Sequence, residues 1–158
     1  MPTSPIVQIL LLVATGVCLL ALWKGGPTER IGAGIILANL VFDLFGSPAL
    51  PAEFRPTLRL VMDALTASCL LALTMWYASL WLGAAMLLFA AQFTLHSYYF
   101  VTNRPPDYFH AMVNNLNYLG VIMCLAVGTA VSWRWRVADR RAAEADAEAH
   151  DATATPAA

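Results

Sequence analysis

Two carboxylates and one imidazole stand out in a chain that otherwise consists mainly of apolar residues. Asp43, Asp63 and His96 each lie within a long apolar segment, where an ionisable side chain is costly and usually faces the protein interior or a cavity. Together these groups can transfer protons, bind a divalent ion or activate water for hydrolysis. Mixed oxygen and nitrogen ligands suit several ions, so we predict no particular metal and no cofactor.

Amide and hydroxyl side chains accompany the ionisable groups at helical spacing. Gln92 and His96 are four residues apart, and Asn114, Asn117 and Tyr118 follow an i, i+3, i+4 pattern, so each set shares one helix face. Counted at about 1.5 Å per residue, all of them fall in the outer third of the membrane. The candidate polar pocket therefore comprises Asp43, Asp63, Gln92, His96, Asn114, Asn117 and Tyr118.

Arg59 precedes Asp63 by four residues, and we expect the two to form a structural ion pair. That pairing would leave Asp43 and His96 free to titrate or to bind a ligand. Asp63 and His96 should also approach each other, because a short turn near Ala78 makes their helices antiparallel and brings both residues to a similar depth. Alternatively, the polar groups satisfy one another and only specify helix packing.

Two other patterns carry no chemistry in this interpretation. His96 and His110 have the separation of haem ligands on one membrane helix, but Pro105 and Pro106 break any helix that would contain both histidines. The three cysteines lie far apart and form no CxxC pair, so we interpret them as small buried apolar residues.

The composition predicts the elements that must position these side chains. The 158-residue chain is 59% hydrophobic and 12% charged, with a mean hydropathy of +0.64, whereas a soluble domain is about 25% charged. A bilayer core about 30 Å thick needs roughly 17–25 apolar helical residues per crossing, and about five segments qualify. We expect an all-α, polytopic membrane bundle with spans at about 6–23, 31–45, 58–76, 80–99 and 112–133.

The break between the third and fourth spans is not marked by glycine or proline. Residues 57–99 form one apolar stretch that is too long for a single crossing and suits two. We divide it near residues 77–79, where Trp76, Tyr77 and Trp81 form an aromatic cluster of the kind found at membrane surfaces.

Basic residues predict the orientation and the domain limits. With five spans, most arginines and the one lysine gather on the side of the C-terminus, which the positive-inside rule places in the cytoplasm, with the N-terminus outside. We therefore expect a multi-pass protein of a cell membrane, the bacterial inner membrane or its equivalent. Residues 1–136 form the transmembrane domain. Residues 137–158 form a cytoplasmic Ala/Glu-rich helical extension that ends in a disordered tail from Asp151.

The sequence leaves three classes of function open. We favour a non-catalytic accessory or binding subunit of a membrane complex, or a binder of a lipid-like ligand, because the chain has no catalytic signature. The alternative is a small proton- or ion-coupled permease that uses the polar cluster, although the spans contain no midplane charge and no broken helix. A membrane-embedded hydrolase is the third reading.

The expected partners follow from charge and from small residues. The formal net charge of −1 gives no support to nucleic-acid binding, and the lipid bilayer is the main partner. A membrane protein or a second copy of the chain could also pack on two small-residue ridges. These ridges are Gly120–Cys124–Gly128–Ser132 and Ala64–Ser68–Ala72.

Overall fold

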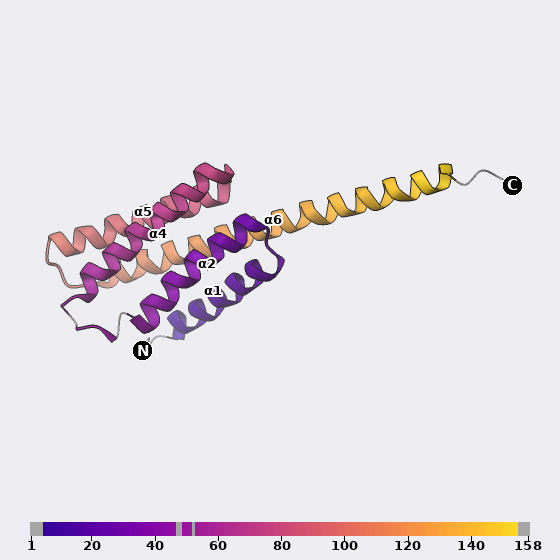
Figure 1. Ribbon diagram of the computed structural model, residues 1–158. Helices are drawn as coiled ribbons and strands as arrows, with labels where there is room; N and C mark the ends of the chain where they lie inside the picture. Colours follow the sequence, from indigo (N-terminus) through magenta and orange to yellow (C-terminus); the bar gives the residue numbers. More distant parts are fainter. Residues whose placement is uncertain (1–4, 47–48, 52, 155–158) are drawn as a thin grey trace.

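The computed structural model describes residues 5–46, 49–51 and 53–154, and within these ranges it contains helices and turns but no strand (Figure 1). The elements are α1 (Pro5–Lys24), α2 (Pro27–Val41), the π-helical turn η1 (Phe42–Gly46), α4 (Arg55–Tyr77), α5 (Leu80–Val101) and α6 (Tyr108–Ala154). Within the described chain, four helices are long and apolar enough to cross a membrane: α1, α4, α5 and α6. The predicted all-helical, membrane-type bundle is confirmed, and the span count and orientation stay predictions.

The connection between α1 and α2 is shorter than the sequence indicated. Only Gly25 and Gly26 separate the helices, and α2 begins at Pro27, ahead of the predicted start at residue 31. Proline is favoured at the first helical position, and the Glu29 side chain accepts a hydrogen bond over 2.9 Å from the N–H of Gly26, the residue that precedes the helix. These two local signals start the helix before its apolar run begins.

The hairpin of α4 and α5 turns at the predicted place. Ala78 adopts a left-handed conformation with φ 48° and donates its N–H to the Thr74 carbonyl over 2.8 Å, which ends α4. The next helix begins at Leu80. The predicted division of residues 57–99 is therefore confirmed, although an alanine here takes the conformation that glycine usually supplies.

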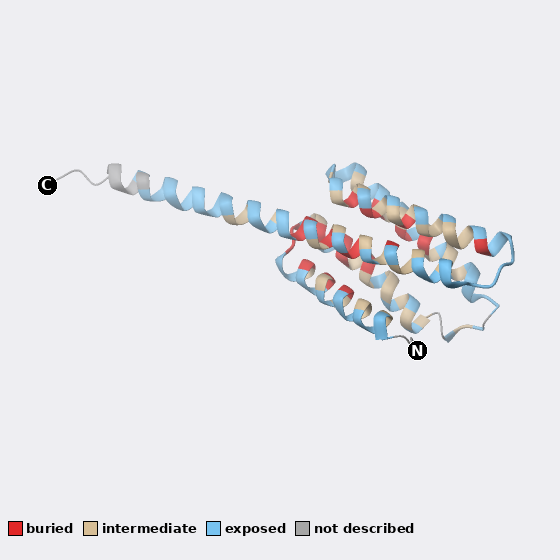
Figure 2. Cartoon of the chain, turned by 180° about the vertical axis from the view of Figure 1, so that it is seen from behind, coloured by how far each residue is buried: buried red, intermediate tan, exposed pale blue. Residues whose placement is uncertain are grey.

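The helices pack as an antiparallel bundle around a small apolar core (Figure 2). The α4–α5 hairpin forms the largest contact, α5 also packs on α6, and α1 lies against α2 and α6. Buried residues face the inside of the bundle, whereas the outer faces of the helices carry exposed apolar side chains. Members of the core include Ile36, Leu70, Leu82, Ala85, Phe89, Val121 and Leu125. An outer surface of this kind suits lipid.

The two small-residue ridges have different surroundings. On α6, a Cβ added to Gly120 would come within 2.8 Å of Leu88, so this ridge packs against α5 inside the chain. On α4, Ser68 and Ala72 are exposed. The α6 ridge is thus used for intramolecular packing, and the α4 ridge is the one that remains open to a partner.

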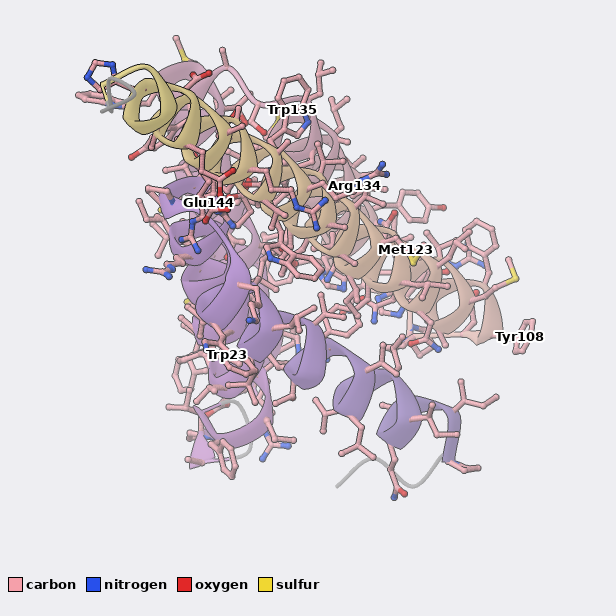
Figure 3. The ribbon with its side chains drawn as sticks, turned by 90° about the vertical axis from the view of Figure 1, so that its right-hand side faces the viewer. Trp23, Tyr108, Met123, Arg134, Trp135 and Glu144 are labelled. Carbon is pink, nitrogen blue, oxygen red and sulfur yellow. The ribbon has the colours of Figure 1, made fainter. Side chains whose placement is uncertain are left out.

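Helix α6 runs on far beyond the bundle (Figures 1 and 2). It continues without a break through residue 136, where we expected one domain to end, and it includes residues 151–154, where we expected disorder. The other residues of the expected disordered segment, 155–158, lie outside the described residues. Trp135 and Glu144, which are labelled in Figure 3, are both exposed.

Candidate functional site

The Asp63 end of the bundle, where α4 begins and α5 ends, holds most of the predicted pocket residues. His96 Nδ1 is hydrogen-bonded to Asp63 Oδ2, and the two side chains are only 13% and 6% exposed. The predicted approach of Asp63 and His96 is confirmed. A buried carboxylate needs a partner, and in this bundle the partner comes from the neighbouring helix.

Arg59 does not pair with Asp63, so the predicted structural ion pair is wrong. Its Nε donates to Asp43 Oδ1 over 2.9 Å, and both side chains are about half exposed, at 51% and 52%. Side chains of a helix lean toward its N-terminus, and Arg before Asp is the weaker order for an i, i+4 pair. Arg59 therefore reaches away from Asp63 to Asp43 in the first turn of η1, and neither Asp43 nor His96 is left free.

His110 joins this polar cluster from the start of α6. Its ring stacks on His96 with 5.2 Å between centroids and 27° between planes, and it meets Tyr99 edge-on at 4.7 Å. The two prolines before His110 do break the helix, as predicted, but the loop folds back so that the two imidazoles meet. An unbroken line of contacts runs from Asp63 through His96 and His110 to Tyr99.

The remaining predicted pocket residues lie deeper in the bundle and make fewer side-chain hydrogen bonds than Asp63 and His96. Asn117 is buried at 9% exposure, and neither its Nδ2 nor the hydroxyl of Tyr118 has a hydrogen-bond partner among the described residues. Gln92 and Asn114 are half-buried and make no side-chain hydrogen bond to a described residue. The predicted pocket is thus one hydrogen-bonded pair with several polar neighbours, rather than a convergent set of ligands.

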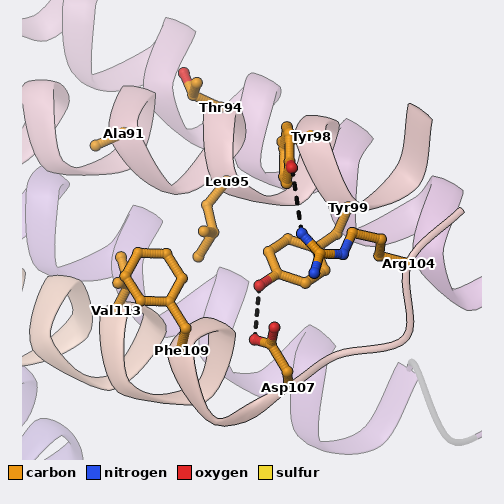
Figure 4. A pocket seen from close by; sticks show the side chains of 9 residues that line it. All are labelled: Ala91, Thr94, Leu95, Tyr98, Tyr99, Arg104, Asp107, Phe109 and Val113. Carbon is orange, nitrogen blue, oxygen red and sulfur yellow. Dashed lines mark hydrogen bonds between the residues drawn. The ribbon is translucent and has the colours of Figure 1, made fainter. Parts of the chain in front are cut away.

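An open groove of about 610 Å³ lies beside this cluster, between the end of α5 and the start of α6 (Figure 4). Ala91, Leu95 and Val113 line it with apolar surface. At the loop end it is lined by Arg104, whose Nη1 donates to the Tyr98 hydroxyl over 3.4 Å. The groove therefore pairs an apolar wall with a charged, hydrogen-bonding rim, and sequence analysis missed it because its two walls come from different helices.

Asp107 fixes the loop that carries this rim. Its Oδ1 accepts hydrogen bonds from the Tyr99 hydroxyl over 2.6 Å and from the His110 N–H over 2.9 Å. These two donors hold the pKa of Asp107 below its ordinary value. The hydrogen bond to the Tyr98 hydroxyl raises the pKa of Arg104, so the rim carries one fixed negative and one fixed positive charge.

The opposite, Glu29 end of the bundle contains a buried carboxylate that sequence analysis did not select. Glu29 is 6% exposed and accepts hydrogen bonds from the Gly26 N–H, the Trp81 indole over 3.2 Å and the Ser132 hydroxyl over 3.0 Å. Arg136 donates to Ser132 over 2.8 Å. Four segments of the chain thus meet at one side chain. The signal that could have revealed it is Pro27 with Glu two residues later, a helix-start pattern.

Trp81 belongs to the group of side chains hydrogen-bonded to Glu29 and does not belong to an aromatic belt at the membrane surface. A Cβ added to Gly32 of α2 or to Gly128 of α6 would lie 2.6 or 2.5 Å from its indole, so the ring is wedged between these two helices. The aromatic cluster predicted around residues 76–81 therefore splits. Trp76 is 84% exposed, whereas Trp81 faces inward.

In the described part of the chain, no group of three His, Cys, Asp or Glu side chains is placed to hold a metal ion. The Asp63–His96 pair contacts a second imidazole and no hydroxyl or thiol nucleophile that is described. Comparison of the chain with known protein families, curated proteins and solved structures finds no match.

Proposed function

We propose that this chain is a non-catalytic integral membrane protein that binds a lipid-like ligand in the groove between α5 and α6. The observation that carries the proposal is the amphiphilic character of the groove. Leu95 and Val113 line its apolar wall, and the Arg104 guanidinium stands at its loop end. Ligand sites of this type join an apolar surface to a few placed polar groups.

The dimensions of the groove suit the part of a lipid nearest its headgroup. From Tyr98 to Ala91 the wall follows α5 for seven residues, or about 10 Å at helical rise. The connecting residues 102–107 lie between two helices that are long enough to span a membrane. In a bilayer this would place the charged rim among the headgroups and the apolar wall beside the first carbons of an acyl chain.

The proposal extends to the location of the protein and to the surface on which a partner would pack. We place it in a cell membrane, with the bacterial inner membrane as the expected site, because its outer helix faces are apolar and most of its arginines lie at or beyond the Glu29 end. The exposed ridge of Ser68 and Ala72 on α4 is where a larger complex or a second copy would pack.

A proton-coupled permease is the second candidate, favoured by the line of contacts from Asp63 through His96 to His110. Histidine is the side chain whose ordinary pKa lies nearest to neutral pH, and histidines are common in the proton relays of transporters. Against a continuous path, Val121, Ile122 and Leu125 of α6 are at most 2% exposed and fill the bundle below Asn117. Purified protein in liposomes that carry a pH-sensitive dye would test this candidate, because proton flux lost in His96→Ala would support it.

The lipid-binding proposal can be tested with a variant in which a larger side chain fills the groove. In mild detergent, native mass spectrometry should detect lipid adducts on the purified protein, and Leu95→Trp should remove most of them. Leu87→Trp is the matched control, because Leu87 lies on the same helix, is 65% exposed and is outside the groove. Adducts that persist in Leu95→Trp, or that vanish equally in both variants, would contradict the proposal.

A further inference from the structure

We propose that the groove between α5 and α6 selects a zwitterionic phospholipid, with the lipid phosphate at Arg104 and its ammonium group at Asp107. This inference rests on the proposed function, since it names the class of ligand for the same groove. Both charged side chains line the groove, and both belong to the short connection between α5 and α6. An aliphatic wall below two opposite charges is complementary to a headgroup that also carries two opposite charges.

Arg104 has hydrogen-bonding capacity to spare. The hydrogen bond that it makes in the described part of the chain is a long one, 3.4 Å from Nη1 to the Tyr98 hydroxyl, and the side chain is exposed. A guanidinium group offers five N–H donors in a planar fork that matches phosphate oxygens. Figure 4 shows this group beside Tyr98 at the loop end of the groove.

Asp107 has one carboxylate oxygen that is already engaged and one that is available. The hydrogen bonds from Tyr99 and from the backbone of His110 both end on Oδ1, and no described residue donates to Oδ2. The side chain is exposed and ionised, because its pKa is lowered. An ammonium group can donate to Oδ2, whereas a headgroup with phosphate alone would bring a second negative charge toward this carboxylate.

The position of these charges on the chain fits a headgroup. Arg104 lies three residues beyond the end of α5, and Asp107 immediately precedes α6. Connections between membrane helices lie at the surface of the bilayer, where phosphate and ammonium groups are found. Leu95 lies nine residues before Arg104, so one lipid can touch the charged rim with its headgroup and the apolar wall with its chain.

The test compares two phospholipids with identical acyl chains, phosphatidylethanolamine and phosphatidylglycerol. Native mass spectrometry of the full chain in detergent should show about fivefold more adduct with phosphatidylethanolamine, the factor expected for one partly exposed charge pair. Asp107→Asn should reduce this ratio to about one, because an amide oxygen still accepts from Tyr99 and His110 but carries no charge. Arg104→Gln should weaken binding of both lipids, while Arg140→Gln on the exposed α6 extension should change neither.

Different results identify which of the two proposals fails. Equal or stronger binding of phosphatidylglycerol by the unmodified chain, removed by Leu95→Trp, would overturn the headgroup assignment and leave the groove as a lipid site. An unchanged preference in Asp107→Asn would likewise overturn the assignment. Failure of both lipids to bind at all would overturn the proposed function together with this inference.

Discussion

At the residue scale, the ionic contacts of this protein differ mainly in burial. Asp63 and His96 are almost fully enclosed, whereas Arg59 and Asp43 are half exposed. Removing one member of an ion pair in a low-dielectric interior strongly destabilises the fold, because the other member is left buried and unpaired. An ion pair exposed to water or headgroups contributes little to the free energy of unfolding.

We therefore predict that His96→Ala destabilises the protein by about 3 kcal/mol and that Asp43→Asn costs less than about 1 kcal/mol. The reason is that His96→Ala leaves the Asp63 carboxylate without its partner inside the bundle. Melting temperatures of the purified variants in detergent measure the difference. An equal drop in melting temperature in the two variants would mean that burial does not determine how much each pair stabilises the protein.

Glu29 gives a second prediction at this scale, because three donors converge on its carboxylate. Glu29→Gln replaces one acceptor oxygen by an NH₂ group that must face one of these donors, and we expect a loss of about 2 kcal/mol. Trp81→Phe removes only the indole N–H and should cost about 1 kcal/mol. Glu53→Gln, at an exposed position, is the control and should leave the melting temperature unchanged.

At the scale of elements, the connection between α5 and α6 is held by a side chain that titrates. Asp107 accepts hydrogen bonds from both helices, and its pKa is lowered in the folded protein. A group with a depressed folded-state pKa contributes stability above its unfolded pKa and loses it as the pH falls through the folded value. Its ordinary value is 3.8, so the contribution is complete near neutral pH.

We predict that the stability difference between the unmodified chain and Asp107→Asn is present at neutral pH, begins to shrink below about pH 4 and is lost once the pH has fallen through the lowered folded-state pKa of Asp107. The two proteins become alike because the protonated carboxyl no longer carries the charge that strengthens both hydrogen bonds. Melting curves recorded from neutral to acidic pH measure this. A difference that stays constant across the range would show that Asp107 acts through shape alone.

The extension of α6 is an element that should matter little for folding. Residues 140–148 are exposed, and the helix there has left the bundle. A stop codon after Arg141 should therefore leave the melting temperature unchanged, whereas a chain ending before Ser132 should lose the hydrogen bond to Glu29 and melt earlier. Thermal unfolding of the two truncated proteins checks this.

At the scale of the whole molecule, α2 and η1 together determine the expected number of membrane crossings. Helix α2 has 15 residues, and η1 continues it without a break for 5 more. At about 1.5 Å per residue these span about 30 Å, the thickness of a bilayer core. The Arg59–Asp43 pair joins the far end of this segment to the start of α4.

We predict five crossings, with the N-terminus outside and the C-terminus in the cytoplasm. Reporter fusions after Ser47 and Asp107 should then report the outside, and a fusion after Ala158 the cytoplasm. A cytoplasmic signal after Ser47 would mean that α2 and η1 do not cross. An outside signal after Ala158 would overturn the orientation.

The positions of the helices and several of their limits could be predicted from length and hydropathy along the chain. Backbone groups must be satisfied inside the segment in lipid, so long apolar stretches can only be helical, and their lengths give the number of segments. The turn at Ala78 and the contact of Asp63 with His96 followed from length and depth alone. Segment length and depth can both be obtained by counting residues along the sequence.

Which faces of the helices meet could not be predicted in this way and is seen only in the folded bundle. The i, i+4 rule predicted a partner for Arg59 on its own helix, but the direction of its side chain brings it to Asp43 in the first turn of η1. A loop that folds back brings His110 onto His96, and packing of three helices encloses Glu29 and Trp81. The physical reason is that periodicity fixes a residue's face on its helix, whereas the rotation and approach of neighbouring helices, set by close packing, fix what that face touches.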